Sequence, residues 1–153
     1  AILNAWLAYS VSKKSQHILK KWLAPTLLVC ACYSFGYGFE IMANDVKSAY
    51  AAFYIEFSFS AFLPFLLLLF AVSYTGNEVY LKKWHTIALL AFPAIHVVAN
   101  FTNANHSLFL KSLYLEDFGW LKTLVLIPGP LFYSYFTVSS LVILFTTLLL
   151  FNP

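Results

Sequence analysis

The chain alternates long apolar runs with short segments that hold most of its charged residues. An α-helix needs roughly 20 residues to cross the hydrocarbon core of a membrane. Four runs approach or reach that length, at residues 22–43, 49–73, 85–101 and 132–151. A further apolar stretch at 1–11 is too short to span, and we expect it to be the end of a helix whose beginning is missing. The pattern predicts an all-α membrane protein: one domain over residues 1–153, with about five transmembrane helices of which the first is truncated.

The composition excludes most soluble functions. Apolar residues make up 61% of the chain and charged residues 10%, which leaves too little polar surface for a globular domain of 153 residues. The nine basic residues are all lysines, and they flank the apolar runs instead of forming a stripe that could bind nucleic acid. Cys30 and Cys32 lie within an apolar run, which favours two reduced packing residues over a disulfide or metal pair. The lipid bilayer is therefore the expected partner.

The positions of the lysines predict an orientation. They gather in the first and third connections, as Lys13, Lys14, Lys20, Lys21, Lys82 and Lys83. The positive-inside rule places these connections in the cytoplasm. We therefore expect a multi-pass protein of the plasma (inner) membrane, with its N-terminus and the loop 102–131 outside and its C-terminal end cytoplasmic.

Prolines and glycines mark the ends of the predicted helices. Gly76 follows the third run and suits a left-handed helix cap. Pro64 lies within that run and should kink its helix, unless a neighbouring group satisfies the freed carbonyl. In the outer loop, residues 107–115 and 120–127 are apolar enough to lie in the membrane interface, and Pro128-Gly129-Pro130 marks the re-entry.

Polar side chains inside the predicted helices carry the candidate chemistry, because such groups are costly in lipid unless they are paired or hydrated. Consecutive helices alternate direction, so the end of the second, the start of the third, the end of the fourth and the start of the fifth share one membrane level. This predicts a polar, aromatic-lined cavity open to the outside that binds a small molecule, with the carboxylates meeting a cation or hydrogen-bond donors. The candidate ligand-binding residues are Tyr37, Glu40, Glu56, Ser60, His96, Asn100, Asn103 and Tyr133.

Other interpretations of these residues stay open. Glu40 and His96 could be solvated at the interface, and Glu56 could pair structurally with a neighbouring helix. Two histidines and two carboxylates at one level could form a metal site or an intramembrane enzyme, but their spacing matches no short metal motif. A transporter or channel subunit is a further alternative, although no internal repeat is visible. We expect no cofactor, no bound metal and no catalytic machinery in this segment.

Several motifs resemble one family, the N-terminal seven-transmembrane sensor region of bacterial histidine kinases, also found ahead of some diguanylate cyclases. Residues 61–76, with Pro64 and the ending Tyr74-Thr75-Gly76, are similar to its third helix. The other similar segments are Gly36-Tyr37-Gly38-Phe39-Glu40, Glu56, Pro93 with Asn103-Ala104-Asn105-His106, and Gly129-Pro130-Leu131-Phe132. Ser73 stands where the family has Glu. The sixth and seventh helices, the dimerisation helix with its phosphorylated His and the ATP-binding domain are not in this sequence.

The resemblance implies a receptor of a two-component system. It would bind a signal in the outer half of the bundle and pass a change in helix packing to a cytoplasmic kinase or cyclase module of the parent chain, as a homodimer. Pro64 would act as the pivot of this relay, with Tyr74, Thr75 and Gly76 reporting at the inner face. A plain membrane anchor, with sensing done elsewhere in the parent, is the remaining alternative.

Overall fold

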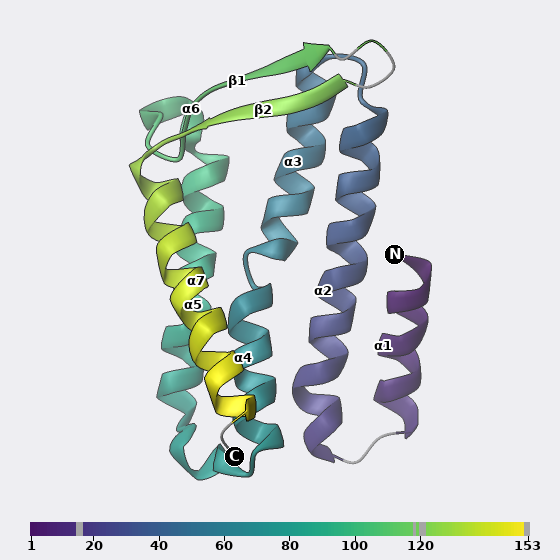
Figure 1. Cartoon of the computed structure of the whole chain (residues 1–153), viewed down its shortest axis with the longest axis vertical. Helices are drawn as coiled ribbons and strands as arrows, with labels where there is room; N and C mark the ends of the chain where they lie inside the picture. The colour runs from purple at the N-terminus through teal and green to yellow at the C-terminus, as the bar shows by residue number, and fades with distance from the viewer. Residues whose placement is uncertain (15–16, 118, 120–121, 152–153) are drawn as a thin grey trace.

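The computed structural model describes residues 1–14, 17–117, 119 and 122–151, which form an elongated helical bundle with a β-hairpin at one end (Figure 1). The helices are α1 (Ile2–Lys14), α2 (His17–Met42), α3 (Val46–Ser60), α4 (Leu63–Tyr74), α5 (Lys83–Phe101), α6 (Asn103–His106) and α7 (Pro130–Phe151), with the 3₁₀ turn η1 (Asn77–Tyr80). The strands are β1 (Leu110–Asp117) and β2 (Lys122–Pro128).

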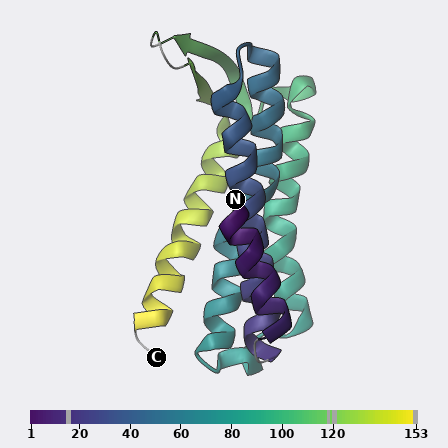
Figure 2. The ribbon, with the colours of Figure 1, turned by 90° about the vertical axis from the view of Figure 1, so that its right-hand side faces the viewer.

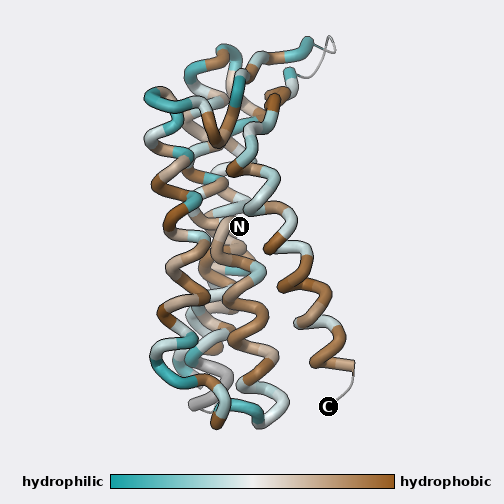
Figure 3. Tube along the Cα trace, turned by 90° about the vertical axis from the view of Figure 1, so that its left-hand side faces the viewer, coloured by the Kyte–Doolittle hydropathy of each residue, from teal (hydrophilic) through white to brown (hydrophobic). Residues whose placement is uncertain are grey.

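The predicted class, an all-α membrane bundle, is confirmed. Four helical segments among the described residues are long and apolar enough to cross a membrane: Lys21–Met42, Val46–Tyr74, Lys83–Phe101 and Pro130–Phe151. Apolar residues follow the middle of these helices, whereas hydrophilic residues gather at the hairpin end and at the opposite end (Figure 3). With 13 residues, α1 is about 20 Å long and shorter than the other spans. The chain is therefore an integral membrane protein.

The third apolar run forms two helices instead of one kinked helix. α3 ends at Ser60, and α4 begins at Leu63 with Pro64 in its first turn. Proline has no N–H to donate to the carbonyl four residues earlier, and its ring clashes with that carbonyl in a continuous helix. Pro64 therefore interrupts the run, and Ala61 and Phe62 form a turn between the two helices.

The segment expected to be an outer loop is ordered by strand pairing. β1 and β2 are antiparallel, with Leu113 opposite Leu126 and Leu115 opposite Leu124. These leucines recur at every second position, so they share one face of the hairpin, and they belong to the core at this end of the bundle or pack against it. From its apolar content, this segment was expected to lie in the membrane interface. Only the spacing of its leucines, at every second position, predicts strands.

Two features tie the hairpin to the bundle. The Asn103 side chain donates to the Leu110 carbonyl at 2.8 Å and accepts from the Phe109 and Leu110 N–H groups at 2.9 and 3.0 Å. Gly129 packs directly on the backbone, because an added Cβ would lie only 2.2 Å from the Leu108 carbonyl oxygen. Asn103 and Gly129 therefore fix both ends of the hairpin to α5 and α7.

The connection between α2 and α3 is closed by a charged cap. Asp45 Oδ1 accepts from the N–H groups of Lys47 and Ser48 at 2.9 and 3.0 Å, and Oδ2 accepts from the Ser48 hydroxyl at 2.8 Å. These bonds, first of all the one from the Ser48 backbone, lower the pKa of Asp45 below its ordinary value. The carboxylate therefore stabilises the start of α3.

The helices pack in two groups around the hairpin end. α2 packs against α1, α3 and α4, and α7 packs against α4 and, less extensively, α5. A core of aromatic and aliphatic side chains under the hairpin joins the groups, with Phe53 and Phe57 from α3, Leu110 from β1 and Phe109 just before that strand. α7 is tilted relative to the other helices (Figure 2). This arrangement places the polar residues of the spans between the two groups and at their contacts.

Candidate functional site

The helix ends that carry the predicted ligand-binding residues do lie at one level. The end of α2, the start of α3, the end of α5 and the start of α7 all lie at the hairpin end of the bundle (Figure 1). The polar residues at this level form two separate clusters. One lies between α2 and α3, and the other lies along α5 and the start of α7.

The α2–α3 cluster is built on a close contact of two backbones. A Cβ added to Gly36 of α2 would lie 2.8 Å from the Glu56 nitrogen of α3, so only glycine lets the helices approach this closely. Glu40 follows Gly36 by one turn on the same face of α2. Side chains lean toward the N-terminus of their own helix, so in this antiparallel pair Glu40 and Glu56 lean toward each other.

The two carboxyl groups of this cluster, which we call the carboxyl pair, lie close enough to interact directly. Both side chains are half-buried, and Glu56 Oε2 is buried without a hydrogen-bond partner among the described residues. An acidic side chain within a transmembrane segment is costly unless it is paired or hydrated. The described residues leave part of the carboxyl pair without a hydrogen-bond partner inside the protein.

Aromatic and hydroxyl side chains extend this cluster along the helices. The rings of Tyr33 and Tyr37 stack with centroids 6.3 Å apart, and Tyr33 lies within electrostatic range of Glu56. Tyr37 is 47% exposed, so its hydroxyl is free to approach a ligand. Ser60 is the last residue of α3, one turn beyond Glu56 and next to the break. Tyr33 was not among the predicted site residues.

The α5 cluster is committed mostly to internal bonds. His96 is 6% exposed, and its Nδ1 lies 2.9 Å from the Phe92 carbonyl oxygen and its Nε2 3.1 Å from the Ser134 hydroxyl. A carbonyl only accepts, so Nδ1 donates to Phe92, and both ring nitrogens lie within hydrogen-bond distance of protein groups. Asn103 uses its amide on the hairpin backbone. These two predicted ligand residues therefore hold the fold together.

Asn100 is the exception in the α5 cluster. It lies between His96 and Asn103 on the predicted face, and its side chain is fully buried. Both its amide nitrogen and its amide oxygen lack a hydrogen-bond partner among the described residues. Burial closes this amide to a ligand in the present packing.

The start of α7 differs from the prediction. Tyr133 is 60% exposed and lies on the outer surface, whereas Tyr135, two residues later, is half-buried and packs against Phe57 and His96. Tyr133, Thr137 and Ser140 recur on one face of α7, and Tyr135 and Ser139 on another. The sequence offers two faces with hydroxyl groups and does not show which one is inward.

The predicted relay residues lie at the opposite end of the bundle. Gly76 has φ of 75°, which confirms its left-handed cap, and the Thr75 hydroxyl donates to the Ala71 carbonyl at 3.0 Å. Tyr74 is 65% exposed, whereas Ser73 is 2% exposed and its hydroxyl is unpartnered. A glutamate in place of Ser73 would bury a charge here, so the serine fits this packing.

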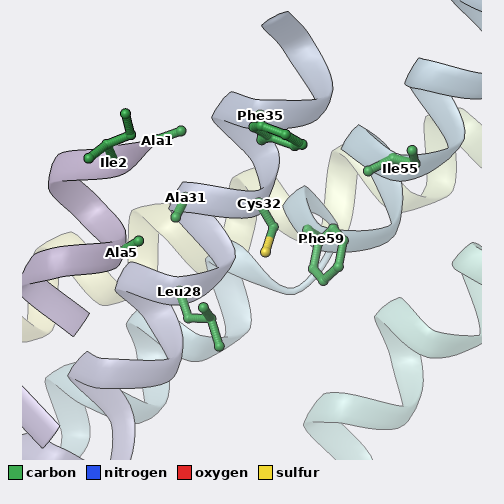
Figure 4. Close-up of a pocket in the computed structure, with 9 residues that line it drawn as sticks. All are labelled: Ala1, Ile2, Ala5, Leu28, Ala31, Cys32, Phe35, Ile55 and Phe59. Carbon is green, nitrogen blue, oxygen red and sulfur yellow. The ribbon is translucent and has the colours of Figure 1, made fainter. Parts of the chain in front are cut away.

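Two grooves run along α2 and α3 beside the carboxyl pair. One, of about 330 Å³, is lined by apolar residues of α1, α2 and α3, among them Phe35, Phe59 and the free Cys32 (Figure 4). The other, of about 510 Å³, lies at the ends of α2 and α3 nearest the hairpin. The predicted ligand residues line neither groove. The described residues also contain no group of three or more His, Cys, Asp or Glu that could hold a metal ion.

The comparisons with known proteins identify one family. The family model for the N-terminal 7TM region of histidine kinase matches residues 1–152, nearly the whole chain. Comparisons with curated proteins and with solved structures gave no match.

Proposed function

Because the chain belongs to the family of N-terminal 7TM regions of histidine kinases, we propose that it detects a small-molecule signal in the outer half of its bundle and transmits it to the kinase. Membership makes the chain a membrane-embedded sensor region linked to a histidine kinase module. The nature of the signal and its binding site are the parts we add.

The carboxyl pair is the observation that carries the proposal. Two acidic groups across the Gly36 contact, one with a buried unpartnered oxygen, are costly within spanning helices. A cationic or hydrogen-bond-donating ligand would offset that cost by neutralising them. The adjacent tyrosines Tyr33 and Tyr37 offer ring faces to a cation and hydroxyls to a polar group.

The lysine distribution supports the direction of signalling. Lys82 and Lys83 lie at the end of the bundle opposite the hairpin, where the positive-inside rule places the cytoplasm. The carboxyl pair would then face the outside of the plasma (inner) membrane, and the C-terminal end of α7 would face the kinase. The receptor would act as a homodimer, as the resemblance implies.

Transmission requires that the ligand bind one helix packing more tightly than another. A ligand that bridges Glu40 and Glu56 would change the fit of α2 against α3 at Gly36. Coupling of about 1 to 3 kcal/mol between such a site and the output is typical of allosteric proteins. The break after Ser60 allows α3 to shift without a matching shift of α4.

Thermal stabilisation of the detergent-purified parent kinase by a library of small polar and amphipathic metabolites tests the proposal. A compound present at 100 times its dissociation constant stabilises the native state by about 2.7 kcal/mol. We expect that stabilisation in the wild type and in the hairpin control Glu116→Gln, and its loss in Glu40→Gln and Glu56→Gln.

The contrary result is a library without a stabilising compound, together with Glu40→Gln and Glu56→Gln variants that unfold at the wild-type midpoint. That result would favour the plain anchor. Transport of the stabilising compound across proteoliposomes would instead support the transporter alternative.

A further inference from the structure

The break between α3 and α4 has a partner on α7. The Tyr135 hydroxyl donates to the Ala61 carbonyl at 3.3 Å, across 74 residues of sequence. We propose that Tyr135 is a positioning residue that latches α7 to this break, so that movement of α3 changes the placement of α7 in the bundle. The relay to the kinase rests on the function proposed above.

The break leaves a carbonyl available to such a latch. The Phe62 carbonyl accepts from the Leu66 N–H at 3.0 Å, whereas no backbone N–H of the described residues is found bonded to the Ala61 carbonyl. Because lipid offers no hydrogen bonds, carbonyls at a break inside a spanning segment need a donor from the protein. The Tyr135 hydroxyl supplies that donor from a different helix.

The latch is also held at its ring. The Tyr135 ring centroid lies 5.2 Å from that of Phe57 on α3 and 5.7 Å from that of His96 on α5. The hydroxyl of Ser134, the residue before Tyr135, lies 3.1 Å from His96 Nε2. Tyr135 therefore contacts α3, the break and α5 at one point of α7.

The contact at Tyr135 matters because much of the rest of α7 is exposed. Ser139 and Thr146 are its fully buried residues among those described, whereas Phe136, Leu141 and Phe145 are 62%, 60% and 56% exposed. α7 packs mainly against α4, so the contacts of Tyr135 contribute to its placement relative to α3 and α5. The latch is also weak, because hydroxyl donors usually lie about 2.7 to 2.8 Å from their acceptor. A weak bond at a helix break suits a contact that opens and closes.

Tyr135→Phe removes the hydroxyl and keeps the ring contacts, which makes it the test variant. Tyr133→Phe is the matched control, since Tyr133 lies on the same helix and is 60% exposed. The full-length kinase would carry spin labels at Leu67 of α4 and Leu141 of α7 in a Cys30→Ala, Cys32→Ala background, reconstituted in vesicles. The readouts are the distance distribution between the labels and the autophosphorylation rate.

We expect Tyr135→Phe to shift or broaden the distance distribution and to change the autophosphorylation rate at least about fivefold, while Tyr133→Phe changes neither. An unchanged distance distribution in Tyr135→Phe would overturn the latch. A changed distance with a wild-type rate would overturn its coupling to the kinase. Glu56→Gln in the same vesicles separates these failures from failure of the proposed function, because it alters the signal site and leaves the latch intact.

Discussion

The two polar clusters at the hairpin end resemble each other in sequence and differ in what their polar atoms do. Both place polar side chains at helical spacing inside predicted spans. In the cluster on α5 and α6, His96 and Asn103 use their polar atoms in internal hydrogen bonds, and Asn100 is fully buried. Between α2 and α3, the carboxyl pair is half-exposed, and one of its oxygens has no partner among the described residues.

The difference separates structural polar groups from ligand candidates. A polar residue in a membrane span is costly in either role, so its presence alone does not indicate function. A partner within the protein explains His96 and Asn103. A half-buried acidic group without such a partner, as in the carboxyl pair, is where a ligand would contribute most.

Among these variants, Asn103→Ala should lower the stability of the protein most. It removes three hydrogen bonds and leaves two N–H groups and a carbonyl of the hairpin without a partner. We expect a loss of at least about 3 kcal/mol, since each buried unsatisfied group costs about 1 to 3 kcal/mol. Thermal unfolding of the detergent-purified protein would show a lower midpoint. Asn105→Ala, two residues away and exposed, is the control and should unfold like the wild type.

Gly36→Ala should disturb the other cluster by separating α2 from α3. The added methyl would lie 2.8 Å from the Glu56 nitrogen, and overpacking of this kind costs about 1 to 3 kcal/mol. Gly38→Ala is the matched control, because its Cβ would meet no atom within 4 Å. Unfolding midpoints of the two variants give the comparison. Equal midpoints would contradict the close contact on which the carboxyl pair is built.

Asn100→Leu tests the role of the buried Asn100 amide, which has no hydrogen-bond partner among the described residues. Replacing an unpartnered buried amide with an apolar side chain of similar size should stabilise the protein by about 1 to 3 kcal/mol. We also expect the variant to keep any ligand response that depends on Glu56. A lower unfolding midpoint would instead indicate that the Asn100 amide has a partner such as a buried water.

The Asp45 cap should give the smallest effect, visible as a pH dependence. Its native pKa is lowered by the Ser48 bonds, so the carboxylate stabilises the native state above the unfolded-state pKa of about 3.9. That contribution is lost as the pH falls through the lowered native pKa. The unfolding midpoint of Asp45→Ala should lie slightly below that of the wild type near neutral pH and converge with it in acid. A constant gap over that range would contradict the charged cap, and Glu116→Ala serves as the exposed control.

The sequence predicted the features that lipid imposes. Runs of about 20 apolar residues predicted the spans, and alternating helix direction placed Glu40, Glu56, His96 and Asn103 at one level. The hairpin was not predicted, because the alternating leucines of β1 and β2 were interpreted by their apolar content. The sequence also could not show which polar groups would find partners, since the bonds of Asn103 depend on the hairpin.

Two further features depended on tertiary packing. Pro64 predicted an interruption of the third span, but the turn at Ala61 and its bond to Tyr135 involve a helix 74 residues away. Hydroxyl residues follow two faces of the first half of α7, so the sequence did not show whether Tyr133 or Tyr135 points inward. The inward face of such a helix is set by its neighbours.

Autophosphorylation of the full-length parent kinase in proteoliposomes tests the role of the carboxyl pair most directly, because it does not require the signal to be known. Glu56→Gln removes one charge of the pair, and Glu116→Gln removes a charge from the exposed hairpin. We predict that Glu56→Gln changes the basal rate at least about fivefold and that Glu116→Gln leaves it unchanged. Wild-type rates in both variants, with normal folding, would contradict a sensing role for the carboxyl pair.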